Sequence, residues 1–435
     1  MPLRDKHSSS FVEVQKSIYS RRIIMRHNAR VLRLDSDADI VREMKLVNVE
    51  DAGIRHMLPK ARHYMVKLEN VRRPIAHILK ETFLSNGGDA AVSRDIITAK
   101  ISHTDVILCG TRKQFQRACA SLLEQKFGCD KLASEIESAI RNFDSPAEVP
   151  DPELFSDSRL ARVFREIGRR TIVMGILNVT PDSFSDGGRF VQTSAAVEHG
   201  RMMAEQGADI IDVGGESTRP GAEPVDAAVE IDRVVPVIRE LAQSVDAAIS
   251  VDTYKADVAR AALDNGAHIV NDISAASFDP QMITVLVERR CPAIFMHIQG
   301  TPRDMQLAPS YTDLMGEICA YLRGRIRVAV DAGADERMLM IDPGFGFGKT
   351  VEHNLEILRR LKEFRSIGRP LVIGTSRKST IGKVLGGLPV EERLEGTAST
   401  VALSIAGGAD IIRVHDVKEM ARVARMTDAV VRHDW

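Results

Sequence analysis

The chain has 435 residues, which is long for one average domain, so we expect two. Hydrophobic residues make up 44% and charged residues 27%, an ordinary composition for a protein that forms a packed core. The formal net charge of -1 gives no general attraction to nucleic acid or anionic lipid, and no apolar run approaches the ~20 residues of a membrane span. We therefore expect neither a nucleic-acid partner nor membrane association.

We expect the five cysteines to be reduced thiols, because their number is odd and no CxxC pair occurs. The first residues contain several arginines but no apolar segment of the kind that a secretory signal requires. Both observations favour a cytoplasmic protein.

We predict that residues 1–145 form a small α+β domain of unknown role. Val/Ile-rich runs indicate strands at 63–71, 90–93 and 105–110, and helical periodicity indicates helices at 74–84, 113–124 and 131–142. This order suggests two βαβ-like halves on one sheet. Pro146, Pro150 and Pro152 then mark residues 146–157 as an extended linker.

We predict that residues 158–435 form a (β/α)8 TIM barrel of the α/β class. Short apolar runs alternate with helix-period segments, and this alternation is typical of βαβ units with a parallel sheet. The expected strands are 171–179, 209–215, 248–253, 268–274, 293–298, 338–343, 371–375 and 411–414. A doubly wound open sheet is the competing fold, but no GxGxxG turn follows the first run.

Polar side chains end or follow every one of the eight runs. Each alone could be a helix cap or a turn residue. Together they indicate an active site, because the carboxyl ends of barrel strands meet at one rim. In chain order these residues are Asn178, Arg219, Asp252, Asn271, His297, Asp342, Lys378, Arg413 and His415.

The residue types at this rim suit a heterocycle that carries a diphosphate leaving group. Asp252, Asn271 and Asp342 can match the polar edges of a flat ring once water is excluded. The cationic groups suited to a diphosphate are Arg219, Arg413 and His415. Asn178 offers an oxygen ligand for Mg²⁺.

Several of these segments resemble, in order, the motifs of the dihydropteroate synthase family. The most specific is Met-Gly-Ile-Leu-Asn-Val-Thr-Pro-Asp-Ser-Phe-Ser-Asp-Gly-Gly at 174–188. The others are 214–221, 252–253, 271–272, 342–349, 376–379 and 413–416. The resemblance implies condensation of 6-hydroxymethyl-7,8-dihydropterin diphosphate with 4-aminobenzoate to give 7,8-dihydropteroate, with Mg²⁺ as cofactor and a homodimer as the assembly.

The resemblance also implies roles for individual residues. It assigns the metal–diphosphate contact to Asn178. The catalytic residues would be Asp186, Asp252, Lys378, Arg413 and His415. The substrate-binding residues would be Phe184, Thr218, Arg219, Pro220, Asp252, Asn271, Met296, Asp342, Phe347, Lys378, Ser379, Arg413 and His415.

The reaction that the resemblance implies is a transfer without a protein nucleophile, and the absence of a Ser–His–Asp or Cys–His arrangement at the rim agrees with it. Departure of diphosphate would leave a methylene cation delocalised into the pterin ring, with Asp252 and Asp186 offsetting its charge. Loops 180–188 and 215–224 would close to exclude water before the aryl amine attacks.

Two alternatives remain at this point. One is a pterin-dependent methyltransferase on the same barrel, which passes a methyl group to a corrinoid protein. It has no need of Ser376-Arg377-Lys378 together with Arg413-Val414-His415, which suit an anionic leaving group. The other is a non-catalytic pterin-binding protein, which the intact polar residues at every strand end disfavour.

Overall fold

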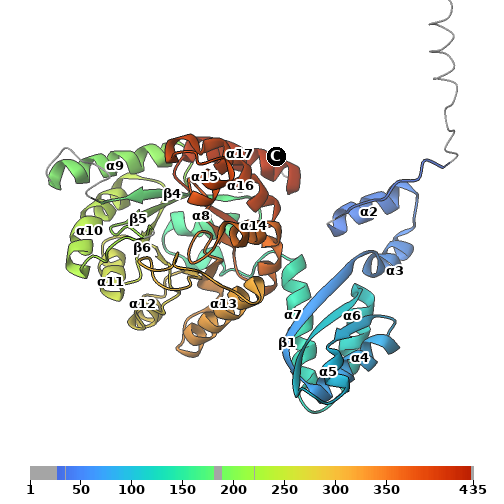
Figure 1. The fold of residues 1–435 in the computed structure, drawn as a ribbon. Coiled ribbons are helices and arrows are strands. Elements are labelled where there is room, and N and C mark those ends of the chain that lie inside the picture. The colour runs from blue at the N-terminus through green and yellow to red at the C-terminus, as the bar shows by residue number, and fades with distance from the viewer. Residues whose placement is uncertain (1–26, 35, 181–188, 220, 433–435) are drawn as a thin grey trace, which may run out of the picture. The chain divides into compact units, whose positions relative to one another are not determined.

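The chain forms two compact units, Met1–Ala133 and Ser134–Trp435, in a computed structural model (Figure 1). The structure describes residues 27–34, 36–180, 189–219 and 221–432. Among the described helices, none combines the length and the apolar character that crossing a membrane demands.

The described residues of the first unit form a three-stranded antiparallel sheet in the order β1-β3-β2. Strand β3 is antiparallel to both neighbours, so β1 and β2 run in the same direction with β3 between them. In chain order the elements are α2 (Asp37–Leu46), α3 (Asp51–Ala61), β1 (His63–Arg72), α4 (Arg73–Ser85), β2 (Asp89–Val92), α5 (Arg94–Ile97), β3 (His103–Thr111) and α6 (Arg112–Leu123). Helix α7 (Cys129–Asp144) leads into the second unit.

The expected pair of βαβ-like halves is wrong, because this sheet has strands for only one crossover, β1–α4–β2. The predicted strands and helices of this region are present within a few residues, whereas α2 and α3 were not predicted. Alternate residues of β3 are buried, and Phe83 and Phe115 pack edge to face beneath the sheet with ring centroids 5.0 Å apart.

The second unit is a closed parallel barrel, as predicted. Its sheet order is β10-β11-β4-β5-β6-β7-β8-β9, and a parallel bridge between Ile341 and Leu371 joins the two ends. The strands are β4 (Ile172–Asn178), β5 (Ile210–Gly214), β6 (Ala248–Asp252), β7 (Ile269–Asp272), β8 (Ala293–Met296), β9 (Leu339–Asp342), β10 (Val372–Ile373) and β11 (Ile411–Val414).

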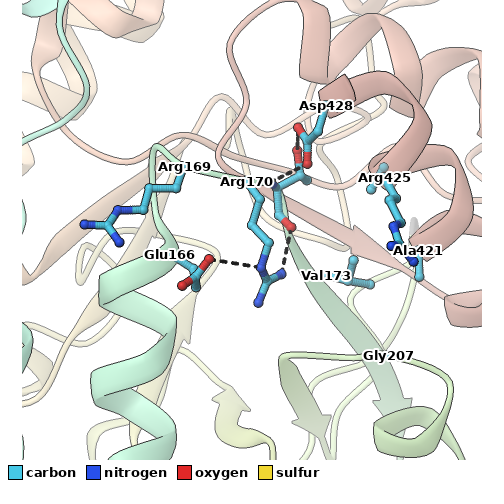
Figure 2. Close-up of a pocket in the computed structure, with 10 residues that line it drawn as sticks. Glu166, Arg169, Arg170, Val173, Gly207, Ala421, Arg425 and Asp428 are labelled. Carbon is cyan, nitrogen blue, oxygen red and sulfur yellow. Dashed lines mark hydrogen bonds and ion pairs between the residues drawn. The ribbon is translucent and has the colours of Figure 1, made fainter. Parts of the chain in front are cut away.

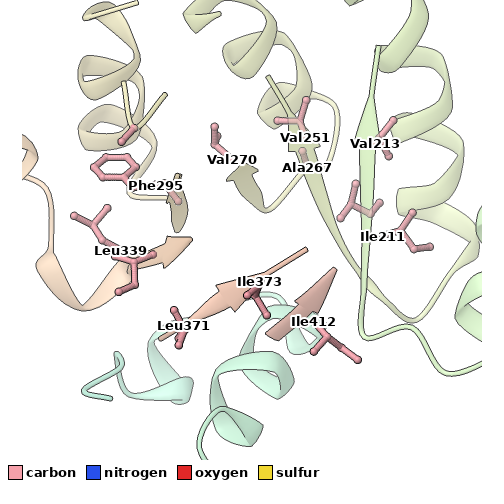
Figure 3. Packing of buried hydrophobic residues seen from close by; sticks show 14 of the residues in the cluster. Ile211, Val213, Val251, Ala267, Val270, Phe295, Leu339, Leu371, Ile373 and Ile412 are labelled. Carbon is pink, nitrogen blue, oxygen red and sulfur yellow. The ribbon is translucent and has the colours of Figure 1, made fainter. Parts of the chain in front are cut away.

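Helices surround this barrel (Figure 1). They are α9 (Arg189–Glu205), α10 (Ala227–Ser244), α11 (Ala256–Asp264), α12 (Gln281–Arg289), α13 (Leu314–Asp331), α14 (Val351–Arg359), α15 (Ser379–Val384), α16 (Leu394–Ala406) and α17 (Val417–Val431). The period-2 alternation of a strand sends every second side chain outward to them. Val213, Val251 and Ile412 are examples of the apolar layer that fills the space between strands and helices (Figure 3).

The inward side chains at the start of the strands form a second apolar cluster that closes one end of the barrel. Ile210, Ile294 and Ile411 belong to it, and helix α8 (Ser158–Glu166) packs against them through Phe164. Phe155, from the predicted linker, stacks on Phe164 with ring centroids 4.8 Å apart. The amino-terminal end of the barrel is therefore a packed core and offers no open channel.

A cavity of about 510 Å³ lies outside this apolar cluster, where α8, the start of β4 and α17 meet (Figure 2). Two charged groups of its lining, Asp428 and Arg170, make contacts that join neighbouring elements. Asp428 of α17 accepts hydrogen bonds from the backbone N–H and the hydroxyl of Thr171, at 2.7 and 2.8 Å. Arg170 binds both carboxylate oxygens of Asp209, at 2.9 and 2.7 Å. These contacts fasten neighbouring elements at the amino-terminal end, opposite to the predicted site.

Candidate active site

The carboxyl-terminal half of the barrel interior is polar. The alternation that turns Ile210, Ile269 and Ile411 inward at the bottom also turns inward the residues two places further along each strand. The interior residues of this upper half are Asn178, Asp212, Ser250, Asp252, Asn271, Met296, Asp342 and Arg413. Strand register aligns them: Asp252 pairs with Asn271 across β6 and β7, and Met296 with Asp342 across β8 and β9.

Arg413 is the centre of this polar layer. Its Nε donates to Asp212 Oδ2 at 2.7 Å, and its Nη2 donates to Asp252 Oδ2 at 2.5 Å. Asn271 Nδ2 donates to the same oxygen of Asp212 at 3.0 Å. Four strands thus contribute to one hydrogen-bond network inside the barrel.

Two carboxylates share one guanidinium in this network, so negative charge is in excess. Burial opposes the charge on Arg413, but Asp212 and Asp252 outweigh it and raise the pKa of the guanidinium. Burial raises the pKa of Asp252, partly offset by Arg413. Asp212 Oδ1, Asp252 Oδ1 and Ser250 Oγ are buried without a hydrogen-bond partner among the described residues. Such orphaned acceptors are expected where a ligand supplies N–H donors.

Asp342 and Lys378 are two further buried charged groups at the mouth, and each influences the pKa of the other. Asp342 accepts the Gly344 N–H at 2.7 Å, and burial raises its pKa although Lys378 opposes this. Lys378 Nζ donates to the Phe345 carbonyl and lies 4.7 Å from the centroid of the Phe347 ring. Burial lowers the pKa of Lys378 to about 8, against the attraction of Asp342.

An apolar shelf accompanies these charges. Met296 and Phe347 belong to one buried cluster together with Ile273, Ile298 and Met305. The turn that carries Phe347 depends on glycine: a Cβ on Gly344, whose φ is +71°, would lie 1.8 Å from the His297 carbonyl oxygen. The arrangement offers a flat apolar surface beside polar groups, which suits an aromatic ring system.

Positive charge gathers beyond the end of β11. His415 Nδ1 lies 3.0 Å from Ser376 Oγ. Burial, reinforced by the positive charges of Arg413 and Arg377, lowers the pKa of His415 to about 3, and the charge of exposed Arg219 contributes in the same direction. Arg377 is held by both oxygens of Asp416. A neutral His415 between arginines can donate to an anion without repelling a cationic neighbour.

Asn178 presents an amide oxygen, a type of donor that Mg²⁺ accepts, at the carboxyl end of β4. A Cβ on Gly214 would lie 3.8 Å from Asn178 Oδ1 and 3.6 Å from Asp252 Oδ2, so both oxygens lie above the same glycine. The described residues contain no cluster of three or more His, Cys, Asp or Glu side chains that could hold a metal. An ion that keeps most of its waters and binds substrate phosphate requires few protein ligands, so a single oxygen donor does not exclude such an ion.

The structure brings most of the predicted residues together, but not all. Asp186, Phe184 and Pro220 lie outside the described residues. Thr218 and Ser379 lie on the loop after β5 and at the start of α15, and within the described chain no hydrogen bond joins their side chains to the network.

Sequence reasoning missed Asp212 and Lys349. Asp212 lies within an apolar strand instead of at its end, and its signal is a carboxylate between Ile211 and Val213. Lys349 is buried, and its Nζ donates to the Phe347 carbonyl and contacts His297 Nδ1, each at 2.9 Å. It supports the turn that carries Phe347.

The comparisons with known proteins agree with this site. Residues 174–415 match the model of a family described as pterin binding enzyme. The chain therefore belongs to the pterin-binding enzyme family.

Within that family the barrel is similar to dihydropteroate synthases. It is 48% identical over 265 residues to the dihydropteroate synthase of Synechocystis, covering 61% of this chain and 92% of the relative. It is also similar to the crystal structure of the Clostridium difficile enzyme in the presence of pteroic acid, at 48% identity and a TM-score of 0.59, covering 61% of this chain and 99% of the other. The Xanthomonas albilineans enzyme with 4-aminobenzoic acid gives 43% identity and a TM-score of 0.57, covering 60% and 93%.

At least two relatives also match part of the first unit. A probable bifunctional folylpolyglutamate synthase/dihydropteroate synthase of Haloferax volcanii is 39% identical over 397 residues, which is 91% of this chain and 46% of the relative. An alignment of that length extends beyond residues 134–435 and so includes part of the first unit.

Proposed function

We propose that the barrel is a dihydropteroate synthase, which condenses 6-hydroxymethyl-7,8-dihydropterin diphosphate with 4-aminobenzoate to give 7,8-dihydropteroate and diphosphate. The observation that carries this proposal is the buried Asp212–Arg413–Asp252–Asn271 network with its orphaned acceptors. The similar enzymes described with pteroic acid and with 4-aminobenzoic acid support it.

The pterin ring binds in the polar upper half of the barrel. Asp252 and Asp342 accept its N–H donors, and Asn271, which has both a donor and an acceptor, matches a mixed polar edge. Met296 packs on the face of the ring. This assignment is supported by burial of all four side chains, because each polar edge of the ring must be matched once water is excluded.

The diphosphate leaves toward the cationic side of the mouth. Arg413 and His415, with Arg219 and Thr218 from the loop after β5, stabilise the negative charge that grows on the leaving oxygens. Asp252, whose carboxylate form is favoured by the neighbouring Arg413, would offset the positive charge that develops on the pterin methylene. Asp186 has the same role in the proposal.

4-Aminobenzoate binds between Lys378 and the apolar shelf. The ammonium of Lys378 pairs with its carboxylate, and Phe347 packs on the ring, with Ser379, Phe184 and Pro220 completing the pocket. The amine then attacks the methylene carbon. Its proton passes to solvent or to the departing diphosphate, so no protein nucleophile is required.

Mg²⁺ is part of this proposal, held by Asn178 and by oxygens of the substrate. When bound, the ion neutralises charge on the diphosphate oxygens. Asn178 lies beside Asp252 above Gly214, so the metal and the pterin methylene would occupy the same end of the barrel.

We also infer a homodimer in the cytoplasm. Helices α16 and α17 expose Leu403, Met426 and Val430 at 59%, 66% and 62%, which is more apolar surface than two adjacent amphipathic helices need to show to water. All five cysteines are free, which suits a reducing compartment.

We assign the first region, 1–145, an accessory role and residues 146–157 a linker role. The Synechocystis relative matches the barrel over 92% of its own length, which supports a barrel that is sufficient for catalysis.

The test is turnover of pterin diphosphate and 4-aminobenzoate by the full chain and by a chain beginning at Ser134. We expect dihydropteroate from both, with kcat/KM within about twofold, and a loss of at least about tenfold in Asp252→Ala and in Lys378→Ala. Binding of pterin diphosphate without product would instead support a non-catalytic pterin-binding protein. Methyl transfer from a folate without release of diphosphate would support the methyltransferase alternative.

A further inference from the structure

A buried charged cluster lies beneath the loop that follows β5. We name Glu216, Glu230, Tyr254 and Lys255 the Glu216 cluster. Lys255 Nζ donates to Glu216 Oε2 and to Glu230 Oε2, both at 2.5 Å, and the Tyr254 hydroxyl donates to Glu216 Oε1 at 2.7 Å. The side chains of Glu216 and Glu230 are 5% and 1% exposed.

Glu216 also joins the two ends of this loop. The Val225 N–H donates to Glu216 Oε2 at 2.8 Å, so one carboxylate contacts both the entry and the exit of the segment. Arg233 of α10 donates to the Gly215 carbonyl at 2.8 Å, and a Cβ on Gly215 would lie 2.8 Å from Val234. The base of the loop is therefore fixed on α10, while the segment between these anchors carries Thr218 and Arg219.

Burying the Glu216 cluster carries a desolvation cost that apolar packing of the loop would not carry. Two carboxylates share one ammonium, and Glu230 Oε1 is buried without a hydrogen-bond partner among the described residues. Burial raises the pKa of Glu230 although Lys255 opposes this. Apolar side chains of similar volume would fill the same space at lower desolvation cost, but they would not define one loop geometry.

The cluster also ties the loop to the strand that holds Asp252. Tyr254 and Lys255 come directly after β6, which ends at Asp252. At the other end of the loop, the charge of Arg219 reaches His415. The Glu216 cluster is thus adjacent along the chain to Asp252 through Tyr254 and to Thr218 and Arg219 through Glu216.

We propose that Glu216 is a positioning residue for the departure of diphosphate and the attack of 4-aminobenzoate. Its carboxylate, held by Tyr254 and Lys255, fixes the segment with Thr218 and Arg219 over the barrel mouth. This inference rests on the proposed synthase function. It assigns Glu216 to the diphosphate and 4-aminobenzoate subsites, and not to the pterin pocket.

The decisive variant is Glu216→Gln. Glutamine keeps the size and can still accept from Tyr254, but its NH₂ group then faces two donors, the Val225 N–H and Lys255 Nζ. We expect KM for 4-aminobenzoate to rise by at least about tenfold, because the loop loses a charged anchor. Binding of 6-hydroxymethyl-7,8-dihydropterin without its diphosphate, measured by calorimetry, should change by less than about twofold.

A matched control is Glu288→Gln, which removes an exposed carboxylate that pairs with Arg260 at 2.7 Å on the barrel surface. It should leave both quantities unchanged. Tyr254→Phe removes one hydrogen bond to Glu216 and no charge, and we expect KM for 4-aminobenzoate to rise by about threefold. This milder variant keeps the test available if Glu216→Gln does not fold.

A merely structural role would lower Tm or the active fraction and leave KM for 4-aminobenzoate unchanged in the folded enzyme. That result in Glu216→Gln, or in a folded Tyr254→Phe, overturns the inference. Absence of turnover in the unmodified chain would overturn the proposed function instead, so the two failures are distinguishable.

Discussion

Asp212→Asn separates the role of the interior network in catalysis from its role in stability. The side chain of Asp212 is fully buried, and one of its oxygens accepts hydrogen bonds from Arg413 at 2.7 Å and from Asn271 at 3.0 Å. An asparagine oxygen can accept both bonds, so the substitution removes charge while it keeps the shape and the hydrogen-bond pattern.

The expected cost follows from the bond to Arg413. A hydrogen bond to a charged group contributes about 1.5–3 kcal/mol, against about 1 kcal/mol for a neutral one. A difference of roughly 0.5–2 kcal/mol corresponds to a loss of about 2- to 30-fold in kcat/KM, if Arg413 must be held in place as the diphosphate leaves. Stability should change little, because the substitution also removes the like charge beside Asp252.

Asp209→Asn is the matched control. Asp209 lies three residues earlier on the same segment, and it also pairs with an arginine, Arg170, but at the amino-terminal end of the barrel. It should lower Tm by about 5 °C and leave kcat/KM unchanged. The assay is incorporation of labelled 4-aminobenzoate at varied pterin diphosphate. Wild-type kcat/KM in Asp212→Asn, or an equal kinetic loss in Asp209→Asn, would refute the reasoning.

Two further outcomes are expected. Burial lowers the pKa of Lys378 to about 8, so its ammonium is present below that pH and is lost above it. KM for 4-aminobenzoate should therefore rise as pH increases through 8. Lys378→Arg should move this rise to higher pH, and an unchanged pH profile of KM in that variant would contradict the assignment. Asp428→Asn weakens three hydrogen bonds, from the N–H and hydroxyl of Thr171 and from Arg432, and should cost about 2–3 kcal/mol in urea unfolding. A change in kcat/KM in this variant would contradict the expectation that Asp428, at the opposite end of the barrel, has no effect on catalysis.

The barrel could be predicted from the sequence because its signals are local. Each apolar run has the length of one strand, and each is followed by a helix-period segment, so element type and order can be read without knowing any contact. The rim residues Asp252, Asn271 and Asp342 could be predicted for a related reason. The carboxyl ends of parallel strands converge whatever the details of packing.

Other features depend on contacts that a single sequence does not reveal. Asp212 was not predicted because it lies inside an apolar strand and not at its end, and its importance comes from Arg413, 201 residues away. Helix α8 was missed although Leu160, Val163, Phe164 and Ile167 follow helical spacing, because a short amphipathic segment gives no sign that it closes a barrel. The two βαβ-like halves were wrong because strand pairing, unlike strand location, is set by tertiary context.

The order of strands in the barrel has a consequence for synthesis of the chain. The last strand to leave a ribosome, β11, inserts between the first and the seventh, and it carries Arg413. Until that insertion, Asp212 and Asp252 lack the arginine that pairs with both of them, so we expect a carboxyl-truncated chain to bind the pterin weakly. Ligand-induced protection from proteolysis would therefore report completion of the whole barrel, not of any fragment.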